Sequence, residues 1–281
     1  MPHKLIIWFL LLLTMASPAV RAEKAALEVG ILPILSTHAL MKTFQPLREH
    51  LEGSLNQPVR IHTARDFRSY YDDLRSGRYL LALAPAHMAR LLQKEAGLIP
   101  LASHLNVNRP LLVVARQHPL PDLSILAGKS LAVFDPLALN VIETQAWLAS
   151  QGLQAGRDYQ VLAASGHNGV LHAVASGTAA MGVVARLGIE NAPAPLRDKL
   201  VVWRELPPTH PLVWVAHPRL EEETERVLRA LLAMRETHAG QAYLRETGYQ
   251  GVRRLGPEDL QPLDDAAERL AKLLKQAQGG S

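Results

Sequence analysis

Apolar and polar positions alternate along this chain in two regular ways. Short apolar runs, such as residues 27–34 and 79–84, have the length and composition of buried strands. Between them lies a segment whose apolar residues follow the i, i+3, i+4, i+7 spacing of an amphipathic helix: Phe67, Tyr70, Tyr71 and Leu74. Strands that alternate with helices in this way predict an α/β fold with largely parallel sheets.

Two such blocks follow one another, and proline-containing segments separate them. Residues 119–122 and 207–211 read as linkers, and the tail after residue 221 has the pattern of helices. We therefore expect two α/β lobes joined by two hinge crossings. The expected boundaries are residues 23–116 plus 208–281 for the first lobe and 117–207 for the second.

Residues 159–184 predict a strand, a polar turn, a helix and a second strand. The turn carries Ser165, Gly166, His167 and Asn168, directly after the first strand. Open α/β sheets bind ligands at this end of their strands, and the free amides of a helix start suit an anion. A simpler alternative is that Ser165 only caps the helix and that His167 is a solvated turn residue.

The N-terminus has the pattern of a secretory signal. A basic start with Lys4 precedes an apolar run over residues 5–16, and Val20 and Ala22 fit the small-residue positions of a cleavage site after Ala22. The apolar run is too short to span a bilayer. Since the chain has no cysteine, we expect no disulfide, and export then indicates the periplasm.

Composition argues against several function classes. The formal charge of +4 includes Lys4 and Arg21 of the signal, so residues 23–281 carry 28 basic and 26 acidic side chains. A balance of +2 with 5% aromatic residues does not favour nucleic-acid binding. The sequence also has no cysteine nucleophile and no GxSxG motif, so we expect no enzymatic activity and no cofactor.

Taken in order, several motifs resemble those of PhnD-like phosphate, phosphite and phosphonate-binding proteins of ABC transporters. They cover nearly all of the chain after the signal: residues 29–33, 44–47, 65–67, 74–77, 123–133 with Asp135 and Pro136, and 165–168 with 173–177. The resemblance implies a type II periplasmic-binding fold, an oxyanion ligand, closure of the lobes on that ligand and delivery to a membrane permease.

The sequence departs from that family after Asp135 and Pro136. The family typically carries a Ser-Thr-Ser-Gly stretch there, which holds the phosphorus oxygens, whereas this chain has Leu137, Ala138, Leu139 and Asn140. Hydrogen bonds to a charged group contribute roughly 1.5–3 kcal/mol each, so the loss of these hydroxyls weakens a phosphonate site by orders of magnitude. We therefore expect other donors or a different small anion.

Candidate ligand-binding residues lie at the predicted strand ends and crossings. They are Ser36, Thr37, His38, Pro85, His87, Leu139, Asn140, Ser165, His167, Asn168 and His210. His38, His87, His167 and His210 are expected to line one cleft if the lobes face each other. Because His167 falls in a predicted surface turn, its replacement by Ala is expected to change stability by no more than about 1 kcal/mol.

Three functions remain open on the sequence alone. The first is a monomeric periplasmic binding protein that hands a small anionic solute to an ABC permease. The second is a periplasmic sensor subunit of the same fold that signals to a membrane histidine kinase or cyclase. The third is binding of a metal or metal complex through the histidines, although no HExxH or HxH spacing occurs.

Overall fold

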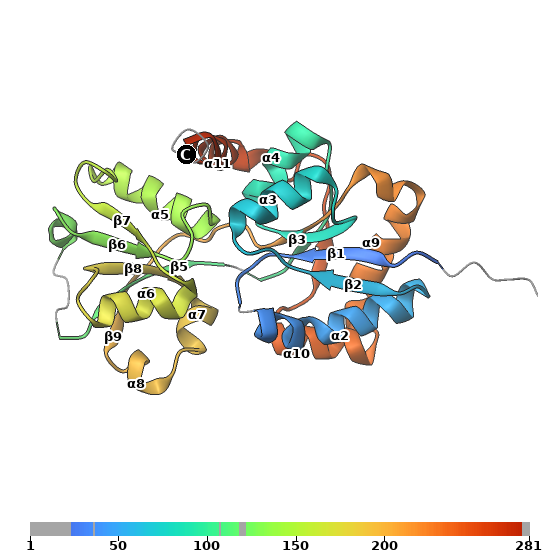
Figure 1. Cartoon of the computed structure of the whole chain (residues 1–281), viewed down its shortest axis with the longest axis horizontal. Helices are drawn as coiled ribbons and strands as arrows, with labels where there is room; N and C mark the ends of the chain where they lie inside the picture. The colour runs from blue at the N-terminus through green and yellow to red at the C-terminus, as the bar shows by residue number, and fades with distance from the viewer. Residues whose placement is uncertain (1–23, 36, 107, 118–121, 277–281) are drawn as a thin grey trace, which may run out of the picture.

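The computed structural model describes residues 24–35, 37–106, 108–117 and 122–276. Figure 1 shows two lobes side by side, each built on one sheet with helices on both faces. This arrangement confirms the predicted bilobal α/β fold. The predicted signal segment, residues 1–22, lies outside the described residues.

The first lobe contains a mixed six-stranded sheet. Its order is β11 (Val252–Arg254), β4 (Ile99–His104), β10 (Val213–Ala216), β3 (Leu81–Ala84), β1 (Leu27–Ile31) and β2 (Val59–His62). β1 runs parallel to β2 and β3, whereas β10 is antiparallel to β3 and β4. The helices on one face are α2 (Thr37–Leu55), α9 (Thr224–Leu232) and α10 (His238–Thr247), and those on the other are α3 (Phe67–Ser76) and α4 (Ala86–Ala96) (Figure 1).

The second lobe contains a five-stranded sheet. Its order is β7 (Gln160–Ala163), β6 (Ser130–Val133), β8 (Met181–Ala185), β5 (Pro110–Ala115) and β9 (Leu200–Glu205). β6 is parallel to β7 and β8, whereas β5 is antiparallel to β8 and β9. One face is covered by α5 (Leu139–Ser150) and the other by α6 (Gly166–Ala175), α7 (Arg186–Glu190) and α8 (Ala194–Arg197) (Figure 1).

The first crossing between the lobes lies earlier than the sequence predicted. β5 pairs with β8 and β9, so residues 110–115 belong to the second sheet and not to the first lobe. The chain therefore crosses between β4 and β5, in residues 105–109. An apolar run such as β5 fits the centre of either sheet, and the prolines near residue 120 suggested a linker that is not the crossing.

Burial explains why the central strands are apolar throughout. All residues of β3, β5 and β10 are buried, because helices cover these strands on both sides. β9 lies at an edge of its sheet, and three of its six residues, Val202, Arg204 and Glu205, are exposed. Its first four residues are apolar, so an apolar run alone does not distinguish an edge strand from a central one.

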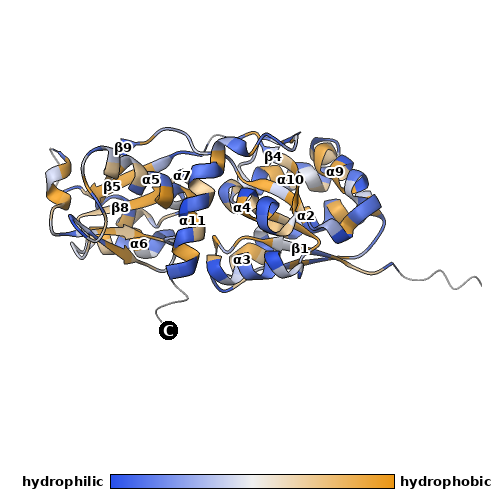
Figure 2. Cartoon of the chain, turned by 90° about the horizontal axis from the view of Figure 1, so that it is seen from above, coloured by the Kyte–Doolittle hydropathy of each residue, from blue (hydrophilic) through white to orange (hydrophobic). Residues whose placement is uncertain are grey.

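The C-terminal helix α11 (Asp264–Gln276) joins the two lobes. It packs against α4 of the first lobe and α5 of the second, as Figures 1 and 2 show from two directions. Arg90 of α4 holds its first residue, with 2.7 Å between Arg90 Nε and Asp264 Oδ1. None of the helices in the described part of the chain is long and apolar enough to cross a membrane.

Candidate functional site

The two sheets turn their strand ends toward each other. In the first lobe, parallel strands β1, β2 and β3 end at one edge, and in the second lobe β6, β7 and β8 do the same. The two crossings leave each sheet at that edge. Loops and helix starts from both lobes therefore meet between the lobes, where open α/β sheets bind their ligands.

A loop between β6 and α5, residues 134–138, makes the contacts that cross this space; we call it the interlobe loop. The Asp135 carboxylate accepts hydrogen bonds from the Leu137 amide at 2.8 Å and from the Phe67 amide of the first lobe at 3.4 Å. Burial raises the pKa of Asp135, and the nearby Asp66 charge adds to the increase. The Asp135 carboxylate thus accepts one hydrogen bond from within the interlobe loop and one from the start of α3 in the first lobe.

His87 of the first lobe forms a hydrogen bond with the interlobe loop. Its side chain is completely buried at the start of α4, and its Nε2 lies 2.9 Å from the Leu137 carbonyl oxygen. A carbonyl only accepts, so Nε2 carries the proton, and Nδ1 is left without a partner among the described residues. Burial lowers the pKa of His87 to about 4, so the ring is neutral at pH 7.

Beside these hydrogen bonds, the Phe134 ring contacts two others, those of Phe67 and His167. The ring centroid of Phe134 lies 6.1 Å from that of Phe67 across the lobes and 4.3 Å from that of His167. A Cβ atom at Gly188 would clash with the His167 ring, so the close packing of α7 on α6 requires glycine there. Burial lowers the pKa of His167 to about 4. The ring is a neutral packing group, which excludes the solvated-turn alternative.

Three helix starts near this space leave their backbone amides available. Among the described residues, α4, α5 and α6 begin without a side-chain cap, although Ser165 occupies the cap position of α6. By contrast, Asp66 caps α3 with a 2.7 Å bond to the Ser69 amide, and Thr237 caps α10. Uncapped amides at the positive end of a helix favour a bound anion.

Asn140 forms hydrogen bonds with residues of both crossings between the lobes. Its Oδ1 accepts hydrogen bonds from Asn108 Nδ2 at 3.0 Å and from Thr209 Oγ1 at 3.1 Å, while the Thr209 amide bonds to the Asn108 carbonyl at 2.8 Å. These three residues tie both crossings to the start of α5. The side-chain oxygen of Asn140 is therefore already used, so a contact of this residue with an anion would fall to its Nδ2 donor.

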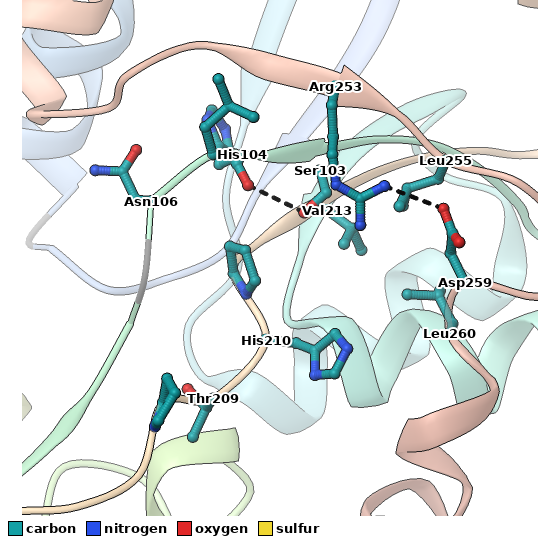
Figure 3. A pocket seen from close by; sticks show the side chains of 13 residues that line it. Ser103, His104, Asn106, Thr209, His210, Val213, Arg253, Leu255, Asp259 and Leu260 are labelled. Atoms are coloured by element: carbon teal, nitrogen blue, oxygen red, sulfur yellow. Dashed lines mark hydrogen bonds and ion pairs between the residues drawn. The ribbon is translucent and has the colours of Figure 1, made fainter.

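His210 lines a cavity of about 200 Å³ between the second crossing and β11 (Figure 3). Arg253 and Asp259 form an ion pair at 3.2 Å on its wall. Burial and the Arg253 charge lower the pKa of His210. This residue thus lies in the hinge region rather than with the groups around the interlobe loop.

The other predicted residues lie at the starts of helices. Thr37 and His38 are exposed at the start of α2, Pro85 is buried before α4, and Leu139 is buried at the start of α5. Ser165 and Asn168 are exposed at the start of α6, and Ser36 lies outside the described residues.

The sequence interpretation missed Phe67 and Phe134. Both belonged to apolar patterns that looked like ordinary core, although Asp135 and Pro136 marked the loop.

The four histidines do not form a metal site. Within the described ranges, no three His, Cys, Asp or Glu side chains gather in a way that could hold a metal ion. His87 is buried and His167 is half-buried, and their side chains contact Leu137 and Phe134, respectively. The alternative of metal binding through clustered histidines has no support.

Comparison with known proteins agrees with this geometry. Residues 29–260 match the family described as "ABC transporter, phosphonate, periplasmic substrate-binding protein". The chain belongs to this family. The match confirms the resemblance of the sequence to PhnD-like proteins, which are transport proteins that bind a substrate in the periplasm.

Solved structures share the type II periplasmic-binding fold. An ABC phosphonate transporter binding protein, PA3383 from Pseudomonas aeruginosa, has a TM-score of 0.78 at 14% identity, with 89% of each chain covered. PhnD1 from Prochlorococcus marinus, in complex with methylphosphonate, gives 0.76 at 15% identity over 88% of this chain and 98% of its own. XAC2383 from Xanthomonas citri, bound to chloride, gives 0.75 at 19% identity over 89% and 99%.

We predict that His167→Ala destabilises this family member by about 2–4 kcal/mol, and not by the 1 kcal/mol or less expected of a surface turn. The change removes a ring packed between Phe134 and Gly188 and leaves a cavity. Urea unfolding measures it. Asn168→Ala, at the exposed neighbouring position, is the control and should change stability by less than about 0.5 kcal/mol. Equal effects of the two substitutions would contradict the buried packing of His167.

We also predict that stability falls as the pH is lowered from 6.5 to 5. His87, His104 and His167 have folded-state pKa values of about 4, 3 and 4, below the ordinary value of 6.5. In this window the unfolded chain takes up protons that the folded chain does not, so each histidine removes up to about 1.4 kcal/mol per pH unit.

Urea unfolding at pH 7.5, 6.5, 5.5 and 5.0 tests this prediction. His87→Gln should reduce the slope by up to the contribution of one histidine. A free energy of unfolding that stays constant over this range would show that these rings are not buried neutral.

Proposed function

We propose that the chain captures a small organic anion between its lobes and presents it to an ABC-transporter permease in the periplasm. Residues 1–22 act as the export signal, and the protein acts as a monomer. The observation that carries the proposal is the set of uncapped helix starts, α4 from the first lobe and α5 and α6 from the second. Membership of the phosphonate-binding family supports it.

The surroundings of these amides favour an anion with an apolar part. Leu137 takes the first place in the stretch where the family carries hydroxyls, and Phe67 and Phe134 lie beside it. Leu137 and Phe134 are half-buried and pack against the apolar core. Amides can hold a carboxylate, sulfonate or phosphonate group, while the apolar side chains favour an alkyl or aryl substituent over a fully hydrated phosphate.

No feature of the described residues favours the sensor alternative over transport. Both roles use the same cleft and the same closure, in which a ligand stabilises the closed form through its additional contacts. The family is described as substrate-binding proteins of ABC transporters, and the proposal follows that description.

We predict that Ser165→Asp weakens anion binding at least about tenfold and leaves the fold intact or more stable. An Asp at this position caps α6 with its own carboxylate and competes with the ligand for the same amides. Calorimetric titration with butyrate, butanesulfonate, methylphosphonate and inorganic phosphate measures the change for each anion that binds.

Ser176→Asp is the matched control, because it places the same charge at the exposed C-terminal end of the same helix. It should leave the affinity unchanged within about twofold. Unchanged affinity in Ser165→Asp, or an equal loss in both variants, would remove the α6 amides from the site.

A further inference from the structure

A second cavity lies on the α5 side of the hinge, apart from the interlobe loop. Its volume is about 300 Å³, and it shares Pro208, Thr209 and His210 with the cavity of Figure 3. We call it the Trp147 cavity after the indole in its wall. Four prolines also line it: Pro110, Pro207, Pro208 and Pro262. Proline fixes its own backbone, so these walls resist collapse.

Glu143 is the only charged side chain among the described residues that line this cavity, since burial lowers the pKa of His210 and keeps its ring neutral. No hydrogen bond or ion pair to Glu143 occurs within the described part of the chain. Removal from water raises its pKa; Arg269 of α11 opposes the increase, and Asp265 adds to it. A half-buried carboxylate without a direct partner is costly unless a cation pairs with it.

Trp147 adds a second group that attracts cations. The guanidinium carbon of Arg204 lies 5.4 Å from the centroid of its ring, so the indole already holds one cation from outside the cavity lining. Leu139, Leu206 and Leu263 complete an apolar wall. The cavity therefore combines one negative charge with a rigid apolar and aromatic surface.

We propose that the Trp147 cavity binds a small organic ammonium compound with an apolar body. The ammonium group pairs with the Glu143 carboxylate, and the apolar body packs against Trp147 and the prolines. An anion is disfavoured, because it would face the carboxylate. The amine site lies at the hinge and uses none of the α6 amides, although Leu139 at the start of α5 borders both this site and the proposed anion site.

Benzylamine serves as the probe, with benzyl alcohol as its uncharged analogue of the same shape. Titrations of the full mature chain at pH 8, followed by calorimetry and by NMR shifts of the Trp147 indole, should show benzylamine binding at least about tenfold tighter than the alcohol. Glu143→Gln should abolish this preference. Its fold should be retained, since an unpaired half-buried charge is removed.

Glu190→Gln is the matched control, because it makes the same change at an exposed position of the second lobe. It should bind benzylamine like the parent chain, and so should Ser165→Asp. The amine site is overturned if the parent chain does not bind benzylamine, if the alcohol binds equally well, or if Glu143→Gln retains the preference. A loss of benzylamine binding in Ser165→Asp would indicate that the amine binds between the lobes, and it would also overturn the proposed site in the Trp147 cavity.

Discussion

Besides α11, contact between the lobes depends on the interlobe loop, residues 134–138, and on the two groups that hold it. The Asp135 carboxylate binds its own Leu137 amide and the Phe67 amide of the opposite lobe, and His87 donates to the Leu137 carbonyl. A net contribution of about 1 kcal/mol for each hydrogen bond is enough to change the ratio of closed to open forms severalfold. Small changes in these contacts therefore act on closure far more than on the fold of either lobe.

Burial between the lobes also sets the protonation state of the histidines near this space. His87 and His167 are neutral in the folded protein, since removal from water penalises their charged forms. They do not supply positive charge to an anion. The partial positive charge of the uncapped helix starts remains, and it comes from the backbone.

Much of the fold could be predicted from the sequence, because hydrophobic spacing reports which residues are buried. The two blocks, the polar turn at 165–168 and the second crossing at 207–211 all follow from that pattern. The sheet to which β5 belongs could not be predicted, because a fully apolar strand fits the centre of either sheet. Pairing is a long-range property that a local pattern does not contain.

The contacts around the candidate site could not be predicted in detail. Histidines and polar residues were expected at the strand ends, yet the spacing could not show that His167 packs on Phe134 or that Asn140 bonds to the hinge. Phe67 and Phe134 looked like core residues, because an apolar side chain that contacts the opposite lobe has the same pattern as one that fills a single lobe. These differences arise where segments far apart in the sequence meet.

The distance between the lobes tests the central claim most directly. The chain has no cysteine, so spin labels at Lys42→Cys and Glu190→Cys, both exposed and in opposite lobes, report this distance by pulsed electron resonance. We predict one narrow distribution in the parent chain and a broader, longer one after His87→Ala, with cooperative unfolding retained. An identical narrow distribution in both would show that the interlobe loop does not hold the lobes together.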